Sequence, residues 1–202
     1  MSFRFSDIVR VGGPVRPKGP ERKFGPFHYF KALCVINDAG RMGRARLSAE
    51  LGIGEGSMRT LLNELEEASY ITRNNAGIVL TAEGKRLLSS IPVVLGVADR
   101  CAFSLDSYSS VAIVRGAAGK VTNGLTQRDE AVRNGAVGAT TLVIRKGCLL
   151  IPPLMEKVDD GELRKRIFSE LRGRDGDAVI ISSGKARQLA EKSAFAASLT
   201  LL

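Results

Sequence analysis

The sequence lacks tryptophan, has one histidine and three cysteines, and contains no long hydrophobic run. With His28 as the sole imidazole, a zinc or iron site built from several histidines is excluded. Cys34, Cys101 and Cys148 are far apart and form no CxxC pair, so neither a disulfide framework nor a zinc knuckle is expected. The apolar runs are much shorter than the ~20 residues of a spanning helix. We therefore expect a cytoplasmic protein with no membrane segment, metal site or cofactor.

Basic residues outnumber acidic ones, and the excess is uneven along the chain. The 202 residues include 30 Lys and Arg against 21 Asp and Glu, a formal charge of +9. Residues 1–50 hold ten of the basic and four of the acidic residues, so the first quarter carries +6 and the rest only +3. A concentrated basic segment is one signature of a nucleic-acid-binding protein.

Residues 1–25 are predicted to form an extended basic arm. Glycine and proline interrupt this segment too often for a continuous helix. Its cations are Arg10, Arg16, Lys18, Arg22 and Lys23. Such an arm can follow a phosphate backbone or enter a minor groove. A solvated tail, or a strap across the arm's own domain, fits the pattern equally well.

Three helices are predicted next. Apolar residues at helical spacing mark the first over residues 27–39, closed by Gly40. Leu47, Ala49 and Leu51 mark a short second helix, which Gly52-Ile53-Gly54 ends sharply. The third helix is expected over residues 55–68. Its apolar stripe, at positions i, i+3, i+4 and i+7, consists of Met58, Leu61, Leu62 and Leu65.

A hairpin and a fourth helix follow. Two β-rich runs, residues 70–73 and 78–81, flank the turn Asn74-Asn75-Ala76-Gly77, which is a hairpin signal. Thr81 is a suitable N-cap for the helix that carries the apolar residues Leu87, Leu88 and Ile91. The predicted order over residues 26–91 is therefore three helices, a hairpin and a helix.

The run LSAELGIGEGSMRTLLNELEEASYITRNNAGIVLTAEGKRLL resembles the winged helix-turn-helix domains of prokaryotic transcriptional regulators, including its closing LT..G..L phrase. This resemblance implies a third helix lying in the DNA major groove and a hairpin wing that touches the DNA backbone or minor groove. It makes base-facing candidates of Ser57, Arg59, Thr60 and Asn63. The candidates for phosphate contacts and for the wing tip are Arg44, Arg46, Arg73 and Asn75.

The third helix departs from this pattern in its charge. Arg59 stands against four glutamates there, an unfavourable balance beside phosphates unless the glutamates face away. These acidic residues are Glu55, Glu64, Glu66 and Glu67. The alternative is a winged helix used for dimerisation or as a protein-binding adaptor.

Residues 109–202 are predicted to form a second domain, an α/β sandwich of βαββαβα order. Strands are expected at 111–114, 140–144, 149–151 and 178–181, and helices at 126–134, 161–171 and 186–199. Lys146-Gly147 leaves room only for a tight turn, so the second and third strands should form an antiparallel hairpin. The simplest such α+β sheet is ferredoxin-like. Residues 92–108 are either a linker or an extra strand.

A glycine-containing loop before the helix at residue 126 suggests an anion site. Backbone N–H groups at a helix start favour anions, and the charged candidates are Arg115, Lys120, Arg128 and Asp129. The loop has no P-loop or GxGxxG spacing. Glycines that merely permit turns explain the same residues.

The second domain resembles an uncharacterised archaeal two-domain family, on the phrase RDEA…GA.GATTL and on its layout behind a winged helix. The resemblance implies a ligand-sensing C-terminal module. The sequence therefore predicts a homodimeric transcriptional regulator that binds double-stranded DNA and a small anionic metabolite, and that is not an enzyme. An enzyme in residues 109–202 is the alternative, because carboxylates are present there: Asp129, Glu130, Asp159 and Asp160.

Overall fold

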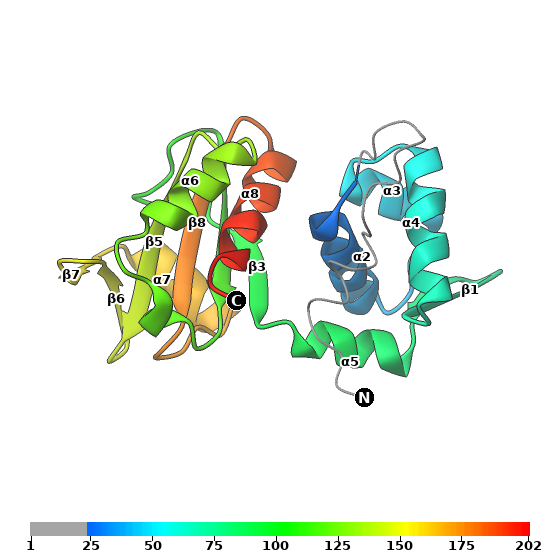
Figure 1. The fold of residues 1–202 in the computed structure, drawn as a ribbon, viewed down its shortest axis with the longest axis horizontal. Helices are drawn as coiled ribbons and strands as arrows, with labels where there is room; N and C mark the ends of the chain where they lie inside the picture. The colour runs from blue at the N-terminus through cyan, green and yellow to red at the C-terminus, as the bar shows by residue number, and fades with distance from the viewer. Residues whose placement is uncertain (1–23) are drawn as a thin grey trace. The chain divides into compact units, whose positions relative to one another are not determined.

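The computed structural model describes residues 24–202, which form a mixed α+β structure (Figure 1). The chain divides between Ile91 and Pro92 into two compact units, unit 1 and unit 2. The α+β class expected from the sequence is confirmed. Residues 1–23, and with them almost the whole predicted basic arm, lie outside the described residues.

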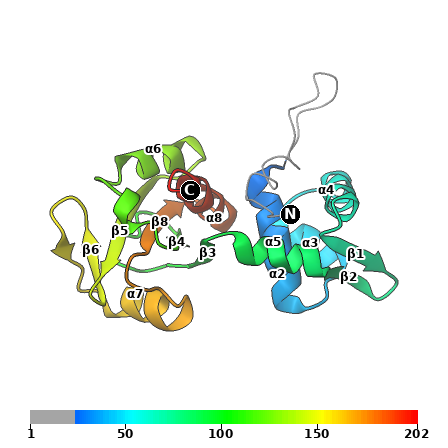
Figure 2. The same cartoon turned by 60° about the horizontal axis from the view of Figure 1, so that its bottom comes forward.

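Unit 1 contains a two-stranded sheet and four helices among its described residues, in the predicted order (Figure 2). Their bounds are α2 (Pro26–Ala39), α3 (Arg44–Leu51), α4 (Glu55–Glu67), β1 (Ile71–Asn74), β2 (Gly77–Leu80) and α5 (Ala82–Ser90). The predicted apolar stripe of α4 is buried against the rest of the unit. Each fully buried Leu or Met side chain there contributes about 1.5–3 kcal/mol, so the stripe fixes which face of α4 stays outside.

Backbone pairing between Met42 and Ile78 joins the turn after α2 to the hairpin. The Met42 amide donates to the Ile78 carbonyl over 3.0 Å, and the Ile78 amide donates back over 2.9 Å. The local sequence of this turn gave no strand signal, because the partner strand lies more than thirty residues away. The pairing fixes the hairpin against α2 and α3.

The start of α5 is held by a side-chain cap and by close packing. The hydroxyl of Thr81 accepts a hydrogen bond from the Gly84 amide at 3.0 Å, which confirms the predicted N-cap. A Cβ atom added to Gly84 would lie 2.1 Å from the carbonyl oxygen of Tyr70. The glycine of the LT..G..L phrase therefore lets α5 lie directly on the backbone that enters β1.

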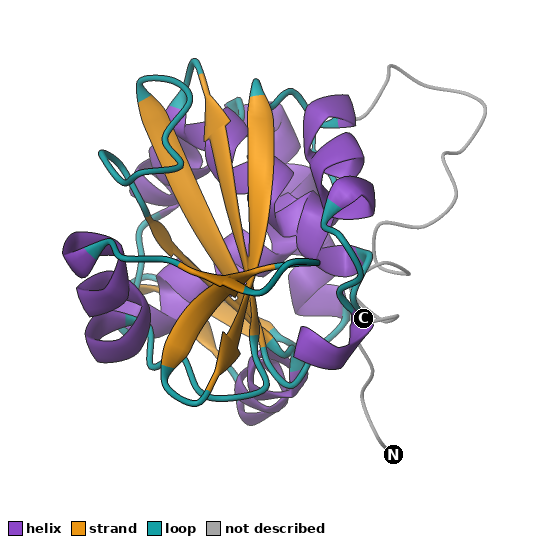
Figure 3. Ribbon diagram, turned by 90° about the vertical axis from the view of Figure 1, so that its left-hand side faces the viewer, coloured by secondary structure: helices purple, strands orange, loops and turns teal. Residues whose placement is uncertain are grey.

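Unit 2 contains a six-stranded antiparallel sheet of order β3-β4-β8-β5-β6-β7. Its strands are among those drawn in orange in Figure 3. The strands are β3 (Val93–Val97), β4 (Tyr108–Val114), β5 (Gly138–Arg145), β6 (Cys148–Ile151), β7 (Glu156–Lys157) and β8 (Ala178–Gly184). The helices are α6 (Leu125–Arg133), α7 (Gly161–Lys165), which continues as a π-helical turn over Arg166–Glu170, and α8 (Arg187–Leu199). Residues 93–97 are thus an extra strand, and β5 and β6 form the predicted hairpin.

The ferredoxin-like strand order expected from the sequence is wrong. A ferredoxin-like sheet places its first strand between the third and fourth, whereas here the last strand, β8, lies between β4 and β5. Every residue of β8 is buried. Val179 and Ile181 pack in the core with Leu163 of α7, while Ser182 bonds Ser193 of α8 on the opposite face. A strand covered on both faces gains most from a central position, and one-sided ferredoxin-like packing would expose half of it.

Candidate nucleic-acid interface

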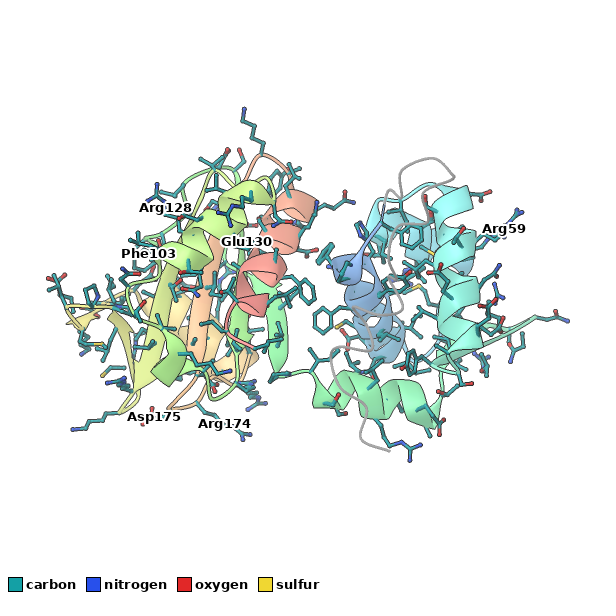
Figure 4. The ribbon with its side chains drawn as sticks, viewed as in Figure 1. Arg59, Phe103, Arg128, Glu130, Arg174 and Asp175 are labelled. Carbon is teal, nitrogen blue, oxygen red and sulfur yellow. The ribbon has the colours of Figure 1, made fainter. Side chains whose placement is uncertain are left out.

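Helix α4 presents a polar stripe outward along the side opposite its buried one. Arg59, Thr60 and Asn63 are exposed, and Ser57 is half-buried. Arg59 extends from α4 away from the other helices of unit 1 (Figure 4). The Thr60 hydroxyl donates to the Gly56 carbonyl of the same helix at 3.2 Å. Of the four predicted base-facing residues, three therefore lie on one accessible helical face.

Three of the four glutamates of α4 have a partner within unit 1. Glu64 accepts a hydrogen bond from the hydroxyl of Tyr29 in α2. Glu66 binds Arg73, whose hydrogen bond holds the pKa of the Glu66 carboxyl below its ordinary value. The Glu55 carboxylate lies 4.0 Å from the Arg44 guanidinium. Arg73 and Arg44 each bring a positive charge to one of these glutamates, so the contacts offset part of the negative charge that the sequence places on this helix.

The remaining basic candidates lie around α4. Arg44 and Arg46 are exposed on α3, and Asn75 is exposed at the hairpin turn. The turn is fixed locally, because the Ala76 amide donates to the side-chain oxygen of Asn74 at 2.9 Å. Arg73 lies on β1 and is bonded to Glu66, so its guanidinium is already engaged.

Arg41 is a basic residue that the sequence reading missed. It is exposed, and its side chain lies beside the hairpin, because a Cβ added to Gly77 would be 3.0 Å from its Cγ. The nearest signal in the sequence was the basic turn that contains it. Only the pairing of Met42 with Ile78 brings that turn to the hairpin.

In the candidate anion loop of unit 2, unlike on α4, two of the predicted basic residues are bonded to other parts of the protein. Arg115 donates to the carboxylate of Asp177 at 2.7 Å and to the carbonyls of Leu171 and Arg172 at 2.8 and 2.7 Å. Lys120 donates to the main-chain oxygens of Leu201 and Leu202 at 2.8 and 3.0 Å. Both cations hold separate segments of the fold. An anion binding at either one would have to compete with these protein partners.

The other two candidates of this loop are accessible. Arg128 and Asp129 are exposed on α6, and Arg128 extends from that helix in Figure 4. The start of α6 is satisfied in part by Asn123, whose side-chain oxygen accepts from the Leu125 amide at 3.1 Å. The structure therefore separates the four candidates into two that support the fold and two on the surface.

Several side chains that could act as acids, bases or nucleophiles have structural surroundings. His28 accepts a hydrogen bond from the Gly25 amide through Nδ1 at 3.1 Å. Burial raises the pKa of Cys34 to about 12, so this thiol stays protonated and unreactive near neutral pH. Asp160 caps α7 by accepting from the Leu163 amide at 2.9 Å. Glu130 bonds the side chain of Asn134 at 2.9 Å.

Residues 24–202 contain neither a cluster suited to a metal ion nor a helix suited to a membrane span. No group of three or more His, Cys, Asp or Glu side chains there is arranged to hold a metal ion. Within the same residues, no helix has the length and apolar character required to cross a membrane.

Comparisons with known proteins place the similarity in both units. Residues 105–201 match the model of a domain of unknown function, DUF4443. The structure resembles that of a hypothetical protein from Pyrococcus horikoshii OT3, with a TM-score of 0.64 and 29% sequence identity over 86% of this chain and 91% of that one. This coverage exceeds the length of either unit, so the likeness spans both. No curated protein matches the chain.

Proposed function

We propose that the chain is a DNA-binding transcriptional regulator in which residues 26–91 form a winged helix-turn-helix domain. The observation that carries this proposal is the outward stripe of α4. Arg59, Thr60 and Asn63 are exposed together, while Glu64 and Glu66 are bonded to other elements of unit 1. A helix that presents exposed Arg and Asn side chains suits the major groove, where these residues read base edges.

The neighbouring elements supply contacts to the DNA backbone. Exposed Arg44 and Arg46 on α3 are suited to phosphates, and Asn75 at the hairpin turn is suited to the backbone or minor groove. Two copies of the chain would read half-sites about one helical turn, roughly 34 Å, apart, as is usual for homodimeric regulators. Such a protein works in the cytoplasm, where its DNA lies.

The test is a fluorescence-anisotropy titration of the full chain against duplexes from a genomic fragment library. We expect a preferred site, and we expect Arg59→Glu to weaken its binding about 100-fold or more, because a contact worth 1–3 kcal/mol becomes repulsive. The matched control is Arg145→Glu, which reverses another exposed arginine, in unit 2, and should leave affinity nearly unchanged. Absence of any preferred site at low salt would refute the proposal.

Salt dependence separates this proposal from a protein-binding adaptor. With about six phosphate contacts, affinity should fall roughly 10³-fold between about 50 and 200 mM salt. A protein–protein interface of the same unit would change far less. Binding that is insensitive to salt would therefore favour the adaptor.

The proposal includes a small anionic metabolite as the signal received by unit 2. Its support is the exposed pair Arg128 and Asp129 on α6. The test is a thermal-shift screen of phosphorylated and carboxylated metabolites. A true ligand at about 100 times its Kd adds about 2.7 kcal/mol, which raises the Tm by several degrees. Arg128→Ala should abolish the shift and Arg133→Ala, on the same helix, should preserve it; equal shifts in both variants would place the ligand elsewhere.

A further inference from the structure

Two arginines lie at the hairpin, and their surroundings differ. Arg73 makes three hydrogen bonds to one carboxylate. Its backbone amide donates to Oε1 of Glu66 at 3.2 Å, its Nε donates to Oε2 at 2.9 Å, and its Nη2 also donates to Oε2. Bonds from both the backbone and the side chain fix β1 against α4 in position and in orientation.

Arg41 has no such engagement. None of the described ion pairs or hydrogen bonds within residues 24–202 involves its guanidinium, and the residue is exposed. Its stem lies along the hairpin, since a Cβ on Gly77 would be 3.0 Å from Cγ and 3.4 Å from Cδ of Arg41. The backbone pairing of the adjacent Met42 with Ile78 holds this stem in place.

We infer that the two arginines divide the work of the hairpin: Arg41 binds a DNA phosphate, whereas Arg73 is a positioning residue that clamps the hairpin to α4 through Glu66. This inference rests on the proposed function and assigns a contact that the sequence reading gave to Arg73. A phosphate at Arg73 would have to displace a carboxylate that already occupies its Nε and Nη2 edge. At Arg41 the phosphate replaces only water.

The salt dependence of binding distinguishes the two roles, because each phosphate contact contributes about 0.9 to the slope of log K against log salt. The probe is a short fluorescein-labelled duplex of mixed sequence, titrated with the full chain between about 50 and 200 mM salt. Arg41→Ala should lower the slope by about one. Between the two salt concentrations the variant should therefore lose about four times less DNA affinity than the wild type does. Arg73→Ala should weaken binding by the same factor at every salt concentration, which gives a parallel line.

The clamp has its own readout in amide hydrogen exchange of the full chain. Glu66→Gln and Arg73→Ala should both speed exchange across residues 72–78, whereas Arg41→Ala should leave it unchanged, because only the first two remove the contacts to α4. A shallower slope for Arg73→Ala with a parallel line for Arg41→Ala would overturn the inference. So would unchanged hairpin exchange in both clamp variants. A wild-type chain that does not bind the duplex at low salt would instead overturn the proposed function itself.

Discussion

The outer face of α4 in unit 1 and the glycine-containing loop of unit 2 use charged residues in opposite ways. In unit 1, Arg59 and its polar neighbours on α4 point outward and make few contacts with the fold. In unit 2, the cations of the glycine-containing loop bind the protein itself: Arg115 holds Asp177, and Lys120 holds the segment at Leu201. A basic residue beside a glycine and a helix start is therefore not evidence of a ligand site until its partners are known.

Asp177 is the charged residue of unit 2 whose removal we expect to destabilise the protein most, because it is buried and fully hydrogen-bonded. Its carboxylate, 5% exposed, accepts from Arg115 at 2.7 Å and from the amides of Gly116 and Arg174 at 2.9 Å each. Asp177→Ala leaves two amides without an acceptor and removes the carboxylate from Arg115, whose guanidinium keeps only the carbonyls of Leu171 and Arg172. We therefore expect unit 2 to lose about 3 kcal/mol of its free energy of unfolding. This loss is measured by urea unfolding, with amide hydrogen exchange at β4 and β8 as the probe of unit 2.

The control for this variant lies two residues earlier. Asp175 is exposed and accepts a single amide hydrogen bond, from Gly147 at 2.8 Å (Figure 4). Asp175→Ala should cost about 1 kcal/mol or less. Equal losses for the two variants would mean that the buried carboxylate is no more important to unit 2 than a surface one.

Unit 1 depends on close packing at Gly84, where unit 2 depends on the buried charge of Asp177. Gly84→Ala forces a methyl group against the Tyr70 carbonyl, 2.1 Å away, so α5 must shift at a cost of about 1–3 kcal/mol. Gly56→Ala in α4 is the matched control, because nothing lies within 4 Å of its added Cβ. That variant should gain up to about 1 kcal/mol. The Tm of each variant in thermal unfolding is the measurement. A Gly84→Ala protein as stable as the wild type would contradict the close packing at this position.

The smallest expected effect concerns an ion pair at the other end of β4. Burial raises the pKa of Asp99, but the Ser109 amide at 2.6 Å and the Arg187 guanidinium at 2.7 Å outweigh it, so the pKa lies below its ordinary 3.8. A lowered pKa adds stability above pH 3.8, and that stability is lost as the pH falls through the lower folded-state pKa. Wild type should therefore exceed Asp99→Asn in urea midpoint near neutral pH and converge with it in acid. A gap that widens in acid would contradict this sign.

Local elements were predictable wherever one residue pattern dominated. The stripe from Met58 to Leu65 defined α4 because apolar residues at helical spacing must bury one face. Thr81 was identifiable as a cap because the bond it makes spans only three residues. The position of β8 was not, since a strand order depends on which strand needs cover on both faces, and no local window contains that comparison.

The candidate residues also differ in whether local sequence or distant contacts determine their surroundings. Arg59, Thr60 and Asn63 could be assigned to an outer face because they fall opposite the buried stripe of their own helix. The partners of Arg115 and Lys120 lie more than fifty residues away in the chain, so the sequence left both as candidate anion-binding residues. Arg41 was missed for the same reason, because its place beside the hairpin depends on a pairing distant in sequence.

By itself the sequence determined the α+β class, the order of elements in unit 1 and the outward face of α4, since each follows from periodicity and capping within a few turns of chain. Only the tertiary structure decided the strand order of unit 2, the hydrogen-bond partners of Glu64 and Glu66, and the partners of Arg115 and Lys120. The physical reason is that a charged side chain binds whichever acceptor or opposite charge the fold brings within about 3 Å, and for Arg115 and Lys120 that group lies more than fifty residues away in the sequence.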